Sequence, residues 1–338
     1  MEAQIRTYLR SKLPQARNLE LRNFRRHTEG WSWETFSCDA HWQEDDREVR
    51  QGYVVRKEPD RAGVVGKYDT FAQFTVLRAL EETPVAAPRV FWYELTRDVL
   101  GAPFFVMEKV EGEIPLPWAD TERGPFADAA EQQRIAHQFV QHLAHLHAVD
   151  WQAKGLAFLG VPEPGRGAAL QEVKKWQTQL DQVELTPMPL LRRALLWLTE
   201  HAPVAPRVSI VHGDYRLGNF ICRDGRIVAI LDWELVHLGD PLEDLGWICL
   251  RPWRGRSPYM ASLLERTALY RLYQSLTGIH VTDEHIRFYE VLGNLKLAVI
   301  HLTAAKAFED GSNTDVRIAT MGHHYIFMLK HIAELLGI

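Results

Sequence analysis

The stretch IVHGDYRLGNFICRDGRIVAILDWE, residues 210–234, decides how this chain is interpreted. Short apolar runs rich in β-branched residues flank a turn at residues 223–225, a pattern typical of a β-hairpin. Asp214 and Asn219 lie five positions apart in the loop before this hairpin, and Asp232 follows its second strand. The sequence therefore predicts a compact β-rich island that presents two carboxylates and one amide.

This island offers the chemistry that phosphoryl transfer requires. A carboxylate must orient or deprotonate the attacking hydroxyl, and metal ions must neutralise the phosphates. The spacing of Asp214 and Asn219 matches the H-R-D-x-x-x-x-N pattern of kinases, with Gly213 replacing the arginine. Asp232 lies where kinases carry the magnesium-binding aspartate of D-F-G. Each motif alone also fits an ordinary turn or a solvated strand end, but their shared order and spacing favour the kinase interpretation.

The sequence on either side of the island predicts two lobes. Residues 19–56 contain alternating runs typical of antiparallel strands, residues 70–80 have helical spacing, and VFWYEL and PFFVMEKV are expected to be further strands. Beyond Gly112, long helical segments prevail. We predict an α+β, two-lobe protein-kinase-like fold with a small antiparallel-sheet N-lobe (1–107), a hinge (108–113) and a larger, mainly helical C-lobe (114–338).

Composition restricts the partners and the compartment. The 338 residues carry a formal net charge of -5, which gives no general attraction to a nucleic-acid backbone. The three cysteines are widely spaced and form no CxxC site, so we expect a reducing compartment, the cytoplasm. We expect no signal peptide and no membrane span. The sequence does not indicate an oligomeric state.

The motifs together resemble the aminoglycoside phosphotransferase family. The resemblance is strongest in VHGDYRLGNFI and AILDWELVHLGDPLEDLGW. LDWE…LGDP, HLAHLHAVDW, LGVPEP with a following KKW, and GWSWETF resemble the branch related to the kinase-like domain of acyl-CoA dehydrogenase family members ten and eleven. This resemblance implies Asp214 as catalytic base, Asn219 and Asp232 as magnesium ligands, and His212 as support for the loop. It also implies that Asp240 ties down the catalytic loop, with Asp244 structural too.

The first lobe should cover the nucleotide. In FRRHTEGWSWETF, Gly30 permits close backbone approach to phosphates and Ser32 offers a hydroxyl, although a lone glycine between strands is also an ordinary hairpin turn. Glu108 to Val110 resemble the hinge whose backbone pairs with adenine. We therefore predict that Gly30, Ser32, Glu108 and Val110 bind ATP.

The phosphate grip departs from the kinase pattern. Arg56 occupies the position of the third-strand lysine, with Lys57 beside it, and arginine can fork onto phosphate. Gln73 occupies the position of the helix glutamate that normally holds this cation. An amide can bond Arg56 but cannot neutralise it, so either the grip is weakened or another acid substitutes. Glu234 either helps the metal site or bonds a loop.

These features predict an enzyme, a kinase that uses ATP and Mg²⁺ to phosphorylate a hydroxyl of a small molecule. The basic cluster in LRPWRGR favours an anionic acceptor, and the branch resemblance indicates a hydroxyacyl-CoA rather than an aminoglycoside; the cluster consists of Arg251, Trp253, Arg254 and Arg256. A solvated loop is the other interpretation. The alternative function is a nucleotide-binding pseudokinase or regulatory module. We assign no metal to the paired and clustered histidines, which are His142, His145, His147, His323 and His324.

Overall fold

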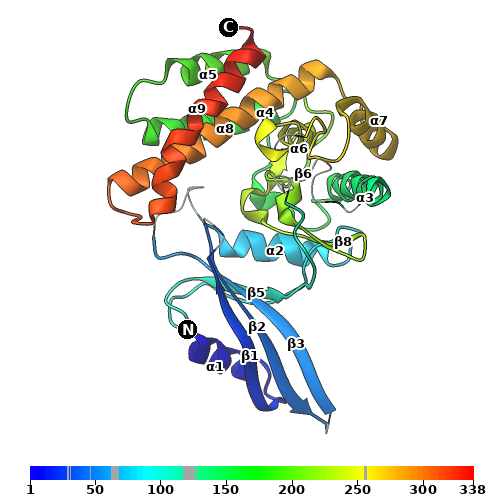
Figure 1. Ribbon diagram of the computed structural model, residues 1–338, viewed down its shortest axis with the longest axis vertical. Helices are drawn as coiled ribbons and strands as arrows, with labels where there is room; N and C mark the ends of the chain where they lie inside the picture. The colour runs from blue at the N-terminus through cyan, green and yellow to red at the C-terminus, as the bar shows by residue number, and fades with distance from the viewer. Residues whose placement is uncertain are drawn as a thin grey trace.

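The protein consists of a small β-rich lobe and a larger helical lobe (Figure 1). The computed structural model describes residues 1–28, 30, 32–45, 47–61, 68–116, 126, 128–254 and 257–338. The N-terminus lies in the β-rich lobe and the C-terminus at the far end of the helical lobe. The predicted α+β class and two-lobe arrangement are confirmed.

One antiparallel five-stranded sheet forms the N-lobe, with the order β1-β2-β3-β5-β4. Its strands are β1 (Arg17–His27), β2 (Glu34–Glu44), β3 (Arg47–Lys57), β4 (Val90–Glu94) and β5 (Phe104–Glu108). Successive side chains of β5 alternate between two cores: Phe104 and Val106 join one cluster, and Phe105 and Met107 join the other. Both faces of the sheet are therefore covered.

The two helices of the N-lobe cover opposite faces of this sheet. Helix α1 (Glu2–Lys12) buries Ile5 and Leu9 in the cluster that contains Phe104. Helix α2 (Thr70–Leu80) begins at Asp69, whose carboxylate accepts from the Ala72 N–H, and its apolar side joins the core of the C-lobe. Figure 1 shows α2 between the sheet and the helical lobe. The two lobes therefore pack against each other through a continuous hydrophobic core.

Two short sheets interrupt the helices of the C-lobe. Strands β7 (Phe220–Arg223) and β8 (Arg226–Ile230) form the predicted hairpin, and both turn residues, Asp224 and Gly225, have positive φ (52° and 68°), as in a type I′ turn. Strand β6 (Ser209–Val211) pairs with β9 (His237–Gly239). The paired strands bring the loops after β6 and β8 to the same edge of the lobe.

The C-lobe is built around α8 (Asp283–Glu309), which packs against α4, α5, α6 and α9. The other helices are α3 (Ala129–His147), α4 (Gly167–Val183), α5 (Pro189–His201), α6 (Leu242–Ile248), α7 (Arg266–Thr277) and α9 (Val316–Leu336), with short 3-10 turns at η1 (Leu156–Leu159), η2 (Leu217–Asn219), η3 (Trp233–Leu235) and η4 (Arg251–Trp253). Helix α8 is long and apolar enough to cross a membrane, but 72% of its most apolar window is buried inside the protein. It is therefore arranged as the central core helix.

Candidate active site

Asp214 lies in the loop between β6 and η2, with its carboxylate held by three donors. Arg216 Nε donates to its two oxygens at 3.0 and 3.3 Å. Asn219 Nδ2 donates to one oxygen at 2.7 Å, and Trp247 Nε1 to the other at 2.9 Å. The Asp214 side chain keeps 14% of its surface exposed. The carboxylate is thus fixed in direction while one side stays accessible.

His212 connects this loop to the strand that ends before Asp232. Its ring Nδ1 accepts from the Asp214 N–H (3.1 Å), and its Nε2 lies 3.0 Å from the Leu231 carbonyl oxygen. This pairing requires a neutral ring that donates from Nε2, and burial lowers the pKa of His212 accordingly. The expectation that His212 supports the loop is confirmed.

Asp244 fixes the backbone of the catalytic loop. Its fully buried carboxylate accepts from the N–H groups of His212 and Gly213, both at 2.9 Å, and lies 3.1 Å from His147 Nε2. Burial would raise the pKa of Asp244, but the hydrogen bond and charge of His147, with smaller contributions from His212, lower it. Asp244 therefore remains ionised beneath the loop.

The expectation that Asp240 ties down this loop is wrong. The Asp240 carboxylate accepts from the Leu242 N–H (2.9 Å) and lies 2.8 Å from His285 Nε2. Asp240 precedes α6 and caps its first turn, whereas Asp244 lies one helical turn later and faces the loop. The sequence places two buried aspartates four residues apart, and only the docking of α6 distinguishes them.

Asn219 and Asp232, the predicted magnesium ligands, lie next to each other. The Leu231 N–H donates to the Asn219 carbonyl at 2.7 Å, which places Asp232 beside η2. The Asn219 amide nitrogen bonds Asp214, so its amide oxygen is the atom left for a cation. Asp232 has a left-handed backbone (φ 65°) and is 31% exposed. The structure thus brings Asp214, Asn219 and Asp232 together at one edge of the C-lobe.

Arg56 crosses from the N-lobe to this edge. Its guanidinium donates to Asp232 Oδ1 at 3.1 Å and lies over the Trp33 ring, 5.3 Å from its centroid. Lys57, one position later, points to the other face of β3 and bonds Glu34 (2.7 Å) and Asp60 (3.3 Å). Arg56 is therefore the cation that faces the site, and Lys57 supports the sheet.

Ser32 makes a second contact between the lobes. Its hydroxyl donates to Glu234 Oε1 at 3.0 Å. Burial, followed by the charge of Asp232, raises the pKa of Glu234 to about 8. Gly30 is exposed, and apart from its chain neighbours no atom of the described residues lies within 4 Å of where its Cβ would be. Its contact with a nucleotide stays a prediction.

Gln73 does not take the place of the helix glutamate. It is buried on α2, and within the described ranges no hydrogen bond joins its side chain to Arg56. It lines a cavity of about 220 Å³ together with Tyr68, Asp69 and Glu234. In the absence of a helix acid, the counter-charge of Arg56 comes from Asp232.

The predicted hinge follows β5. The backbone N–H groups of Glu108 and Lys109 are bonded to the Arg89 and Gly52 carbonyls, while the Val110 N–H has no partner among the described residues. Gly112 (φ 151°) approaches β7 so closely that a Cβ would lie 2.5 Å from an Ile221 methyl. The Val110 N–H is therefore a backbone donor of the hinge that remains available.

Sequence reasoning missed Arg216 and Trp247 as parts of the site, and it named Trp253 only as a member of the basic cluster. Arg216 lies over the Trp253 ring (4.8 Å), which packs on Trp247 (5.3 Å between centroids). The signal for Arg216 was its position two residues after Asp214. Trp247 carried no local signal, because it reaches Asp214 only through the fold.

The described residues of the predicted basic cluster make separate contacts. Arg251 pairs with Glu334 of α9 (3.1 Å), and Arg254 contacts the Pro258 carbonyl (3.5 Å). Of this cluster, Trp253 lies beside the catalytic loop, and Arg256 lies outside the described residues.

The histidine clusters stay without a metal assignment. Across the described residues, the one metal-compatible group is Glu172, His237 and Glu243, which contains none of them. His147 instead bonds Asp244 and the Tyr273 hydroxyl (2.7 Å).

The residues between the lobes fit a magnesium nucleotide. Arg56 Nε, Trp33 Nε1 and Glu234 Oε2 are buried and have no hydrogen-bond partner among the residues that the structure describes. Phosphate oxygens would satisfy the two donors, and a cation would satisfy the carboxylate. Pairing of the Val110 N–H with adenine stays a prediction.

Known proteins share both the sequence and the fold of this chain. Over 241 residues, 70% of the chain, it is 30% identical to mouse (Mus musculus) acyl-CoA dehydrogenase family member 10. Over 299 residues it is 27% identical to family member 11 of chicken (Gallus gallus). The chain spans only 21% and 37% of the lengths of these two relatives.

Solved structures agree on the fold. A candidate aminoglycoside phosphotransferase from Ralstonia eutropha superposes with a TM-score of 0.74 at 24% identity, covering 99% of this chain and 98% of that one. Macrolide 2'-phosphotransferase type I superposes with a TM-score of 0.63 at 18% identity, covering 96% of each chain. Residues 23–279 match the family described as the phosphotransferase enzyme family. With this match over most of its length, and with the catalytic loop and the two lobes arranged around it, the chain belongs to the phosphotransferase enzyme family.

Proposed function

We propose that this protein is an ATP- and Mg²⁺-dependent kinase that transfers the γ-phosphate to a hydroxyl group of a small molecule. The observation that carries the proposal is the carboxylate of Asp214, held by three donors beside Asn219 and Asp232. A base, an amide ligand and a carboxylate ligand in this order are the parts that phosphoryl transfer uses.

Each residue has a role that follows from its contacts. Asp214 would accept the proton of the attacking hydroxyl, since its fixed carboxylate is partly exposed. Asn219 and Asp232 would hold magnesium, which when bound neutralises the charge of the phosphates. Arg56 would exchange Asp232 for phosphate oxygens, and Arg216, already beside Asp214, could reach the transferred group. Ser32, Gly30 and the hinge at Glu108 and Val110 would bind ATP.

For the acceptor, we propose a hydroxyacyl-CoA, less favourably an aminoglycoside. The acyl-CoA dehydrogenase relatives support the first, while hygromycin-B 4-O-kinase of Escherichia coli, 28% identical over 131 residues, supports the second. Arg216 and the Trp247 and Trp253 rings place a cation and an aromatic wall beside Asp214, which suits an anionic ligand with an apolar portion.

A second candidate is a nucleotide-binding module without turnover. Gln73 makes no bond to Arg56 within the described part of the chain, so the ion pair that holds the phosphate grip in kinases is replaced by Arg56 and Asp232. If this pair persists in the nucleotide complex, Asp232 cannot hold magnesium. Under either function we propose a cytoplasmic protein that binds neither nucleic acid nor membrane.

The experiment is ADP formation with Mg²⁺, scanned over 3-hydroxyacyl-CoAs and aminoglycosides. Asp214→Asn should lower turnover at least about 100-fold, with nucleotide affinity within about threefold of the parent. Asp224→Asn, the same change in the exposed hairpin turn, is the matched control and should keep parental rates. Nucleotide binding without turnover on any acceptor would favour the module, and equal rates in Asp214→Asn and the parent would remove Asp214 from the role of base.

A further inference from the structure

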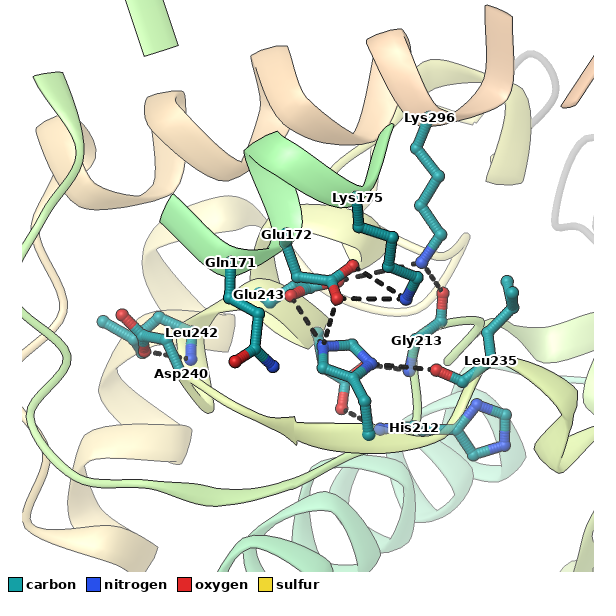
Figure 2. Close-up of polar contacts among 12 residues, drawn as sticks. Gln171, Glu172, Lys175, His212, Gly213, Leu235, Asp240, Leu242, Glu243 and Lys296 are labelled. Atoms are coloured by element: carbon teal, nitrogen blue, oxygen red, sulfur yellow. Dashed lines mark hydrogen bonds and ion pairs between the residues drawn. The ribbon is translucent and has the colours of Figure 1, made fainter. Parts of the chain in front are cut away.

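A cluster of buried charges lies directly beneath the catalytic loop (Figure 2). Its acids are Glu172 of α4 and Glu243 of α6, and its cations include His237 of β9 and Lys296 of α8. All four residues are buried, with at most 6% of their surface exposed. Charges so deep in a protein are stable only when each has a partner. The contacts within the cluster therefore show how each charge is balanced.

His237 carries a positive charge in this cluster. Its Nδ1 lies 2.9 Å from the Leu235 carbonyl oxygen, and its Nε2 lies 3.1 Å from Glu243 and 3.7 Å from Glu172. Both nitrogens therefore face acceptors, and both must carry protons. Burial lowers the pKa of His237, but Glu172 and Glu243 outweigh it and raise the pKa above its usual value.

This protonation argues against a metal ion, although ligand atoms of Glu172, His237 and Glu243 lie within 4.8 Å of one another. A doubly protonated imidazole has no lone pair to offer. Lys175 Nζ also occupies both Glu172 oxygens, at 3.0 and 3.1 Å. The protein itself supplies the cations that balance the two acids.

Lys296 connects this charge cluster to the catalytic loop. Its Nζ donates to the Gly213 carbonyl oxygen at 2.6 Å, as Figure 2 shows, and lies 3.7 Å from Glu243. The ammonium also lies over the Trp247 ring, 4.6 Å from its centroid. The Trp247 indole in turn donates to Asp214. Lys296 thus contacts both the residue before Asp214 and a residue that binds its carboxylate.

The loop needs such a contact because Gly213 has no side chain that would fix its backbone conformation. Its φ is 81°, and a Cβ at this position would lie 2.7 Å from the Leu235 carbonyl oxygen, so the position requires glycine. The flexible residue is restrained from both sides. Asp244 accepts from its N–H, and Lys296 donates to its carbonyl oxygen.

We propose that Lys296 is a positioning residue for phosphoryl transfer, which aligns the Asp214 carboxylate through the Gly213 carbonyl and the Trp247 ring. This inference rests on the proposed kinase activity. Glu172 and Glu243, which also pair with the His237 imidazolium, supply the negative charge that keeps the buried ammonium in place.

The test compares Lys296→Met with Lys175→Met. Both remove an ammonium from the same cluster, but within the described part of the chain Lys175 contacts Glu172 and the Trp176 ring and not the catalytic loop, and it is 44% exposed. In Mg²⁺-dependent ADP release with water as acceptor, Lys296→Met should lower kcat about 10- to 100-fold and leave KM for ATP within about twofold. Lys175→Met should keep kcat within about twofold. Equal kcat values for Lys296→Met and the parent, or an equal loss in both variants, would overturn the proposal.

Hydrogen exchange of residues 212–214 in the nucleotide-free protein provides a readout that does not depend on activity. Lys296→Met should exchange these amides at least about tenfold faster than the parent, and unchanged exchange would refute the contact even if the parent lacked ATP turnover. An inactive parent that binds no ATP would instead refute the proposed function. If Lys296→Met does not fold, Lys296→Gln replaces it: an uncharged, shorter donor should lower kcat at least about threefold at constant KM, and parental kcat would overturn the inference.

Discussion

Asp244→Asn provides the sharpest test of how the catalytic loop is held. The wild-type carboxylate accepts from the N–H groups of His212 and Gly213 and from His147, with none of its side chain exposed. Asparagine has nearly the same shape, so it leaves no cavity. It retains one oxygen acceptor and presents an NH₂ group to a donor, so at least one buried N–H loses its acceptor.

The magnitude follows from these contacts. A hydrogen bond to a charged partner contributes about 1.5–3 kcal/mol, and a buried donor left unsatisfied costs about 1–3 kcal/mol. Because such contributions are not additive, we expect Asp244→Asn to lower the free energy of unfolding by about 3–5 kcal/mol, the range for removing one partner of a buried ion pair.

The assay is urea unfolding followed by tryptophan fluorescence, combined with hydrogen exchange of residues 212 and 213. Asp240→Asn is the control: it also changes a buried aspartate beside α6, but should leave exchange at these two amides unchanged. Two results would refute the conclusion that Asp244 holds the backbone of the catalytic loop. One is a loss of unfolding free energy below about 1 kcal/mol for Asp244→Asn, and the other is equal exchange in both variants.

The pH dependence of the unfolding free energy provides a second check on the role of the Asp244 carboxylate. The pKa of Asp244 is lower in the folded protein than its usual value of 3.8, so its stabilisation is complete above that pH. It is lost as the pH falls through the lower, folded pKa. The difference in unfolding free energy between the parent and Asp244→Asn should therefore be constant near neutrality and shrink below about pH 4.

Three further changes test other parts of the structure. Glu234→Gln removes a carboxyl whose pKa is raised from the usual 4.5 to about 8 in the folded protein, so the variant should be more stable than the parent at high pH. In urea unfolding, this gain in stability should be about 3 kcal/mol larger at pH 8 than at pH 5, and a gain independent of pH would contradict the raised pKa. His237→Gln should be less stable than the parent at pH 6. In thermal melts, the difference in Tm between the two proteins should become smaller as the pH rises through the raised pKa of His237. A difference in Tm that grows with pH would exclude a buried imidazolium. Gly246→Ala places a Cβ 2.3 Å from Tyr289 Cβ where α6 meets α8. The Tm should therefore fall, with a loss of about 1–3 kcal/mol in the free energy of unfolding. An unchanged Tm would show that the two helices separate easily.

The sequence alone determined the features that depend on local pattern. Alternating apolar residues predicted β2 and β3, an apolar run predicted β5, helical spacing predicted α2, and the Asp-Gly turn predicted the β7–β8 hairpin. The order and spacing of Asp214, Asn219 and Asp232 indicated the chemistry, because one loop and one hairpin connect them.

Only the tertiary structure decided which distant residues complete the site. Arg56 meets Asp232 across 176 positions, and Ser32 meets Glu234 across 202. Such contacts form when the two lobes dock, and no local periodicity encodes them. The same reason explains why the loop is held by Asp244 rather than Asp240: both are buried acids near the start of α6, and the direction in which the helix turns determines which one reaches the His212 and Gly213 N–H groups.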